Sequence, residues 1–348
     1  MAIQDTIAEY NLARPAGDTV ARYLDQLEAQ FATTLDALGD HAFARFALGG
    51  GTPSYLDVPQ LQRLFAMLRA GGVDLRAMPA GMEVSPETVD AEKMALCRET
   101  GIDRISMGIQ SFSESEVRAL VRPQQREVVE RAIDAIRAQR FPTLNLDLIY
   151  GIEGQTVASF VASIDSALAF APEELYLYPL YVRPLTGLGR IAEGTGEGRR
   201  EGKRRFALQP EPVDDRLAMY RAGRDRLLAA GYTQVSMRMF RAPHAPATDA
   251  GPAYCCQEDG MVGIGCGARS YTRGLHYASE YGVSRRGVAS EGRCRKSYCR
   301  LYVGDTHFCR ERVLRAARPR LAIEGRRQEG NDGRGRGATA RKARPIVE

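Results

Sequence analysis

The chain has 348 residues, of which 44% are hydrophobic and 26% are charged, an ordinary balance for a globular protein. This length suits one large α/β domain together with a smaller one. No stretch approaches 18 uninterrupted apolar residues, and residues 1–15 lack the basic and apolar regions of a secretory signal. The seven cysteines, an odd number, favour a reducing compartment over a disulfide scaffold. We therefore expect a cytoplasmic protein without a membrane partner.

Charge is distributed unevenly along the chain. Between Arg285 and Glu348 there are 18 Lys/Arg and 7 Asp/Glu, a net of +11, so the preceding 284 residues carry a net of −6. A basic run of this kind can bind nucleic acid through phosphates without sequence preference. No zinc spacing, RNA-binding aromatic motif or helix-turn-helix pattern accompanies it. We expect a disordered basic tail over residues 285–348 and no specific nucleic-acid partner.

Short apolar runs alternate with longer amphipathic ones through the first half of the chain. The polar ends of these runs recur every 27 to 37 residues, and a strand–helix–strand unit takes about 30 residues. Runs that are apolar throughout suit parallel strands buried on both faces. The pattern predicts an α/β sheet or barrel with strands at Phe43–Leu48, Gly81–Val84, Arg104–Ile109, Leu144–Tyr150 and Leu175–Leu180.

The intervening segments carry helix start and stop signals. A helix is expected to open at Asp18 or Thr19, with an apolar stripe that includes Leu24 and Phe31. A second is expected to start at Ser85-Pro86-Glu87 and to end at Gly101. The pair formed by Ser113 and Glu116 has the spacing of a capping box.

Polar residues stand where the predicted strands end, at Gly49, Glu83, Gln110 and Asp147. Ligands of parallel barrels and sheets gather at the carboxyl ends of the strands, although loop solubility alone also favours polar residues there. Asp147 lies inside an apolar run, and such an acid is costly unless it is paired or hydrogen-bonded. It therefore needs a partner, either a ligand or a buried arginine such as Arg122.

A triple-glycine turn follows the first predicted strand in Phe46-Ala-Leu-Gly-Gly-Gly-Thr-Pro53. Glycine permits a positive φ and lets a ligand approach the backbone closely. The turn either binds a ligand or simply connects a strand tightly to a helix, and the glycines alone do not decide between these. It is not a phosphate loop, since no Gly-Lys-Ser/Thr follows.

Taken together, the ordered motifs GGGTPS, MEVSPET, RISMGIQSF, Val121-Arg122-Pro123 and NLDLIYGIEGQT resemble a known family. They are similar to the radical S-adenosylmethionine (SAM) domain of the oxygen-independent coproporphyrinogen III oxidase-like family, over roughly residues 43–190. The resemblance continues less specifically to about Ser284. It implies a partial (β/α)6 TIM-like barrel at 1–190, a linker at 191–213, a truncated α+β domain at 214–284 and the tail at 285–348.

The same resemblance implies a set of ligand-binding residues. Gly50, Gly51 and Thr52 match positions that meet the methionyl amine of SAM through the backbone. The side chains that match those lining the SAM pocket are Glu83, Gln110, Arg122 and Asp147. Carboxylates can accept hydrogen bonds from an ammonium or from ribose hydroxyls, and a guanidinium can pair with a carboxylate. No catalytic residue is assigned.

The family also holds a [4Fe–4S] cluster on three cysteines spaced Cys-x3-Cys-x2-Cys. That motif is expected before the first helix, but residues 1–16 contain no cysteine. Cys255, Cys256 and Cys266 lie well beyond the barrel strands, so we assign no metal ligand. A shifted reading frame at both ends of the gene would explain the missing motif and the basic tail. The absence of codons for Cys-x3-Cys-x2-Cys from the other upstream reading frames would refute this idea.

By resemblance, the expected function is that of a radical SAM oxidoreductase acting on a porphyrin or haem-related tetrapyrrole, with an electron donor if it is active. Two alternatives remain open. The chain could bind SAM or haem without turnover, or it could be an inactive frameshifted fragment.

Overall fold

The computed structural model describes residues 18–50, 52–120, 122, 124–181, 215–247, 260–265, 268–272, 275–278 and 302–303. Its larger sheet has seven strands in the order β1-β2-β3-β4-β5-β7-β6. The first five are parallel, whereas β7 runs antiparallel to both β5 and β6. These strands are β1 Phe46–Leu48, β2 Ala80–Val84, β3 Arg104–Gln110, β4 Thr143–Tyr150, β5 Glu174–Pro179, β6 Thr233–Gln234 and β7 Met239–Arg241.

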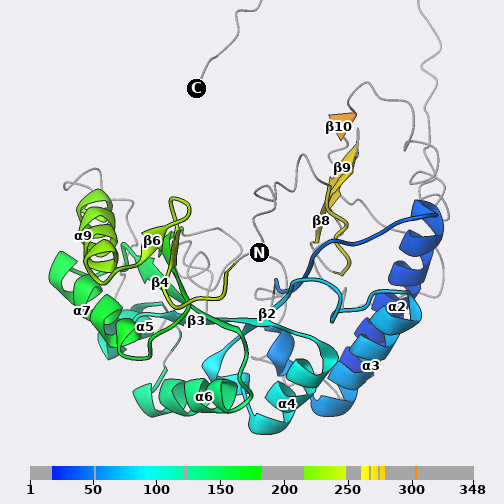
Figure 1. Cartoon of the computed structure of the whole chain (residues 1–348), viewed down its shortest axis with the longest axis horizontal. Coiled ribbons are helices and arrows are strands. Elements are labelled where there is room, and N and C mark those ends of the chain that lie inside the picture. The colour runs from blue at the N-terminus through cyan, green and yellow to red at the C-terminus, as the bar shows by residue number, and fades with distance from the viewer. Residues whose placement is uncertain are drawn as a thin grey trace, which may run out of the picture.

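Helices form an arc around one side of this sheet (Figure 1). The reason is topological: each new parallel strand is added on the same side of the previous one, and right-handed crossovers then place every helix on the same face. The helices are α2 Asp18–Leu38, α3 Val58–Ala70, α4 Ala91–Thr100, α5 Glu114–Ala119, α6 Arg126–Ala138, α7 Val157–Leu168 and α9 Arg216–Ala229. Single 3₁₀ turns, η1 at Pro53–Tyr55 and η2 at Pro86–Thr88, follow β1 and β2. The predicted α/β architecture of a partial barrel is confirmed.

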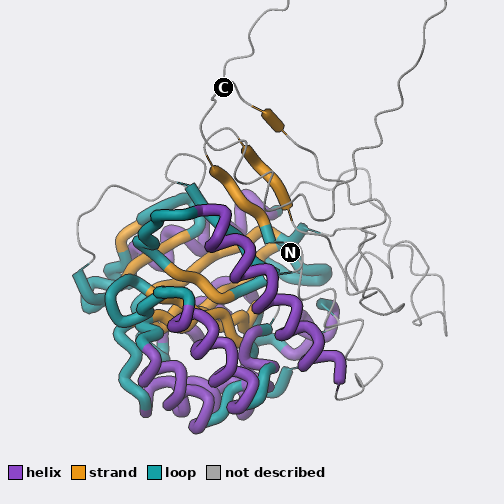
Figure 2. The backbone as a smooth tube through the Cα atoms, turned by 90° about the vertical axis from the view of Figure 1, so that its right-hand side faces the viewer, coloured by secondary structure: helices purple, strands orange, loops and turns teal. Residues whose placement is uncertain are grey.

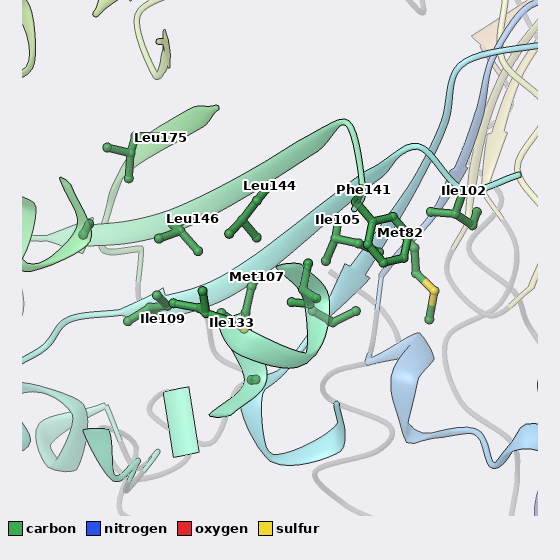
Figure 3. Close-up of a cluster of buried hydrophobic side chains, with 14 of the residues drawn as sticks. Met82, Ile102, Ile105, Met107, Ile109, Ile133, Phe141, Leu144, Leu146 and Leu175 are labelled. Atoms are coloured by element: carbon green, nitrogen blue, oxygen red, sulfur yellow. The ribbon is translucent and has the colours of Figure 1, made fainter. Parts of the chain in front are cut away.

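The core lies between the sheet and its helices. Alternate residues of the central strands point toward the helices, and Ile105, Met107, Leu144 and Leu146 are fully buried there. Figure 3 shows these side chains packed with Ile133 of α6. The other alternate positions of the same strands face away from the helices. We call this second side of the larger sheet its inner face.

All five predicted strands are present, with ends shifted by at most three residues. The helix at Asp18 and its stripe are also confirmed, since Leu24 and Phe31 are buried. Gly101 ends α4 in the left-handed region, with a φ of 117°.

Two expected caps are wrong. The Ser85-Pro86-Glu87 segment forms only the short η2, and α4 starts later, with the Asp90 side chain accepting a hydrogen bond from the Lys93 N–H at 2.8 Å. Ser113 precedes α5, but its side chain makes no capping bond. The capping box fails because the Glu116 side chain is buried and bonded to residues of other segments.

A smaller antiparallel sheet has the order β10-β9-β8, with β8 Arg269–Thr272, β9 Leu275–Ala278 and β10 Tyr302–Val303. Its strands extend away from the larger sheet (Figures 1 and 2). The segment just before β8 lies against α2, where the Gly265 N–H donates to Gln30 Oε1 at 3.0 Å. A Cβ atom at Gly265 would come within 2.7 Å of the Tyr23 hydroxyl, so the two segments are in close contact.

The domain boundaries drawn from the sequence stay a prediction. Strands β6 and β7, from the region assigned to the second domain, extend the larger sheet beyond β5. The expected linker at 191–213 lies outside the described residues, as does the expected tail at 285–348 apart from β10. Among the described helices, none has both the length and the apolar content needed to cross a membrane.

Candidate ligand site on the inner face

Strand alternation makes the inner face polar. Glu83 pairs in register with Ser106, Ser106 with Asn145, and Asp147 with Tyr176. Residues paired in register project to the same side of a sheet. The side chains of β2 to β5 that share the inner face are therefore Glu83, Arg104, Ser106, Asn145, Asp147, Glu174, Tyr176 and Tyr178.

The glycine turn after β1 holds the Glu83 carboxylate. The Gly50 N–H donates to Glu83 Oε2 at 3.1 Å, and Gly50 has a φ of 91°. A Cβ atom at Gly49 would lie 2.7 Å from Glu83 Cδ, so a side chain there would displace the carboxylate. Glu83 is nevertheless exposed, and its carboxylate can accept further hydrogen bonds. Gly51 lies outside the described residues, while Thr52 opens the η1 turn.

Gln110 ends β3 in an unusual conformation. Its φ is 70°, and the pairing between β3 and β4 shifts by one residue between Gly108 and Gln110. A non-glycine residue at positive φ is uncommon and strained, and such residues concentrate at functional sites. The Gln110 amide folds back over Gly108, because a Cβ atom there would meet Gln110 Nε2 at 2.5 Å. Gly108 is the register partner of Asp147, so this amide lies over the β3 position adjacent to Asp147.

Asp147 is half-buried in the middle of the inner face. Its Oδ1 accepts from Asn145 Nδ2 at 2.6 Å, and its Oδ2 accepts from Ser106 Oγ at 3.4 Å. Burial raises the pKa of this carboxyl to about 6, against the opposing effects of the Asn145 hydrogen bond and the Arg104 charge. The negative charge of Glu83 acts in the same direction as burial.

Within the chain, the partners of Asp147 differ from the arginine that the sequence suggested, while the alternative of a ligand stays a prediction. Asn145 and Ser106 supply its hydrogen bonds, and Arg104 is the nearby cation that lowers its pKa. Arg122, the arginine named as one possible partner, follows α5 as an exposed residue whose backbone N–H donates to Val117 O at 3.0 Å. A usable signal was present in the sequence, since Asn145 stands two residues before Asp147 and must share its face of the strand.

An ion pair lies toward the amino ends of the strands. Arg104 Nε donates to Glu174 Oε2 at 2.8 Å, across the intervening β4, and the guanidinium stands 5.7 Å from the centre of the Tyr176 ring. Tyr176 in turn stacks on Tyr178, with ring centres 5.7 Å apart. Because the ion pair occupies this end, the groups still open to a ligand lie at the carboxyl ends of the strands.

The described residues offer no group of three or more His, Cys, Asp or Glu that could hold a metal ion. Cys97, on α4, is fully buried, and its Sγ contacts Met82 Sδ at 3.4 Å. Burial raises the pKa of this thiol to about 12, so it stays protonated at neutral pH and does not suit an iron–sulfur cluster, which requires thiolates. The other six cysteines lie outside the described residues.

The chain is similar to known proteins both in sequence and in fold. Residues 22–167 match the model of the radical SAM superfamily. Oxygen-independent coproporphyrinogen III oxidase from Escherichia coli, described as a radical SAM enzyme, superposes with a TM-score of 0.62 at 22% identity, over 75% of this chain and 60% of that one. The fold is therefore that of a radical SAM protein.

Two curated proteins are similar in sequence to more than half of the chain. Oxygen-independent coproporphyrinogen III oxidase from Pseudomonas aeruginosa is 31% identical over 217 residues, which is 62% of this chain and 43% of that protein. Heme chaperone HemW from Bacillus subtilis is 28% identical over 258 residues, 73% of this chain and 64% of that protein. The chain is similar to parts of both proteins, and it spans about half the length of these relatives.

Proposed function

We propose that the chain binds S-adenosylmethionine at the carboxyl ends of β1 to β4. By resemblance, Gly50, Gly51 and Thr52 meet the methionyl amine through the backbone. The proposed pocket side chains are Glu83, Gln110, Arg122 and Asp147. The observation that carries the proposal is that the exposed Glu83 carboxylate is bonded to the Gly50 N–H while it shares one face with Asp147.

The chemistry of these groups suits a cationic nucleoside ligand. A carboxylate at Glu83 can accept from the methionyl ammonium, and an ionised Asp147 can accept from ribose hydroxyls. Two acids on one face also favour the positively charged sulfonium. Gln110 can both donate and accept, which suits a ligand edge that carries both kinds of group.

Activity on a tetrapyrrole belongs to the same proposal. The Pseudomonas relative is named as an oxidase of coproporphyrinogen III, and we infer a radical SAM oxidoreductase-like activity on a related small molecule. In such a protein the [4Fe–4S] cluster, when bound, supplies the electron that cleaves SAM. We assign no cluster ligand and no catalytic residue in this chain.

The binding proposal is tested by Glu83→Gln. Losing a charge-assisted hydrogen bond costs about 1.5–3 kcal/mol, which is roughly a tenfold or greater rise in the Kd for SAM. Isothermal titration under anaerobic conditions measures this Kd. The matched control is Glu130→Gln on the outer helix α6, where the partly exposed Glu130 side chain pairs with Arg126 at 2.9 Å. Equal affinity of the wild type and both variants, or no SAM binding by the wild type, would refute the assignment.

A second candidate, haem binding without turnover, is favoured by the match to the Heme chaperone HemW, which extends over 73% of this chain. On this view haem titrated into the protein should give a saturable shift in visible absorbance. Because the sequence contains no Cys-x3-Cys-x2-Cys, we expect little iron and sulfide uptake on anaerobic reconstitution. Stoichiometric cluster uptake would favour an active radical SAM enzyme. A haem titration that does not saturate would refute haem binding.

A further inference from the structure

Glu116 is a buried acid that the proposed pocket leaves unexplained. It stands in the first turn of α5 and is 3% exposed. Within the described part of the chain, no Lys, Arg or His forms an ion pair with it. A buried carboxylate without a counter-ion is costly unless several donors surround it.

Three donors from three segments surround this carboxylate. Its Oε2 accepts from Ser111 Oγ at 2.6 Å and from Gln155 Nε2 at 2.8 Å, and its Oε1 accepts from Ser159 Oγ at 2.6 Å. Ser111 is in the loop after β3, Gln155 is in the loop after β4, and Ser159 is in the first turn of α7. Glu116 therefore joins two neighbouring strand-end loops to the helix that follows them.

Gln155, one of the donors to Glu116, also hydrogen-bonds to the backbone of the segment that follows Asp147. Its Nε2 also donates to Ile149 O at 3.2 Å, and its Oε1 accepts from the N–H groups of Gly151 and Ile152 at 2.8 and 3.3 Å. Glu116 and Ile149 O accept only, so they fix which end of the Gln155 amide faces the loop. The turn at Gly151–Ile152 is held as a result.

Ser111, another donor to Glu116, likewise hydrogen-bonds to the backbone on either side of Gln110. The Ser111 N–H donates to Ile109 O at 2.9 Å across Gln110, and Ser111 Oγ accepts from the Ser113 N–H at 2.9 Å. Gln110 lies between these bonds in its positive-φ conformation. Fixing Ser111 therefore restrains Gln110, whose amide lies over Gly108 beside Asp147.

We propose that Glu116 is a positioning residue, whose carboxylate sets the loops after β3 and β4 and thereby the arrangement of Gln110 and of the backbone beyond Asp147. The inference rests on the proposed SAM site but names a residue that does not touch the ligand. The residues proposed to contact SAM are then held in place by the buried Glu116 side chain on α5.

The test compares Glu116→Gln, and the milder Ser159→Ala, with a control of similar structural cost. Tyr232→Phe removes another buried hydrogen bond, from the Tyr232 hydroxyl to Pro172 O at 2.6 Å, before the amino end of β5. Hydrogen exchange of the full chain without ligand is followed in peptides over 110–113 and 151–155, and the Kd for SAM is measured alongside.

Both network variants should raise exchange about tenfold in these two peptides alone and raise the Kd for SAM about tenfold, whereas Tyr232→Phe should change neither. Unchanged exchange in the two peptides would overturn the inference, as would a uniform rise along the chain or an unaltered Kd despite local loosening. If the wild type binds no SAM, the proposed function fails, and the exchange comparison still decides whether Glu116 positions the loops.

Discussion

Replacing Asp147 by Asn is expected to stabilise the folded chain above pH 6 and to weaken SAM binding at the same time. The pKa of Asp147 is raised from 3.8 to about 6, mainly by burial, so the ionised form is disfavoured in the fold. Asparagine keeps the shape, and its oxygen can still accept from Asn145 Nδ2. The gain in free energy of unfolding is at most about 3 kcal/mol, since one pKa unit corresponds to about 1.4 kcal/mol.

The pH dependence of this effect has a definite sign. Between pH 4 and pH 6 the folded wild type binds more protons at Asp147 than the unfolded chain does, so its stability falls as the pH rises through this window. The advantage of Asp147→Asn should therefore grow from about pH 4 and level off above about pH 6. Urea unfolding at several pH values measures it.

Whereas Asp147→Asn is expected to raise stability, it is expected to lower the affinity for SAM. SAM affinity of the wild type should fall as the pH drops below about 6, because a protonated Asp147 loses an acceptor, and Asp147→Asn should bind weakly at every pH. Asp165→Asn is the control, since Asp165 forms an exposed ion pair with Arg226 and such pairs contribute about 0–1 kcal/mol. A destabilised Asp147→Asn with normal SAM affinity would show that the residue serves the fold and not the ligand.

Leu146→Ala is expected to lower the free energy of unfolding by about 2–5 kcal/mol, the usual range for truncating a fully buried leucine. Leu146 is 0% exposed in the central strand β4, with Met107 and Leu175 as its register partners on either side. These neighbours belong to paired strands, whose backbone bonds limit any collapse into the vacated volume.

Denaturant unfolding followed by circular dichroism measures this loss. Leu217→Ala removes the same atoms from a side chain on α9 that is 55% exposed, and surface changes of this kind fall within about 0.5 kcal/mol. Similar losses for the two variants would mean that β4 does not lie at the centre of the core.

Local patterns sufficed for the main elements of the fold. Apolar runs longer than a turn and spaced by helix-length segments predicted β1 to β5, and Gly101 predicted the end of α4. The same reasoning failed for Ser113 and Glu116. Capping-box spacing describes one helix end, whereas the Glu116 carboxylate accepts hydrogen bonds from Gln155 and Ser159, about 40 residues further along the chain. Sequence spacing cannot reveal that a side chain has a better partner elsewhere.

For the candidate site, local sequence patterns suggested some residues but not the contacts between strands. The polar residues near the carboxyl ends of the predicted strands suggested Glu83, Gln110 and Asp147 as site residues, a role that stays a prediction. The partners of Asp147 depended on register between strands. Alternation along β4 was enough to indicate Asn145, but Ser106 and Arg104 required knowledge of which β3 residue stands beside which β4 residue. Register depends on how the whole sheet packs, and the sequence of a single strand does not determine it.

The contact between Gly265 and α2 has a consequence for the order in which the chain folds. The Gly265 N–H bonds to Gln30, 235 positions earlier, and protein synthesis proceeds from the amino end. On the ribosome, β1 to β5 are therefore complete before Gly265 exists, and the contact of Gly265 with Gln30 and with the region of Tyr23 on α2 can form only after Gly265 has been synthesised. The contact between Gly265 and α2 therefore forms late. Because contacts between residues far apart in sequence form slowly, we expect this step to be one at which the new chain is prone to misfold.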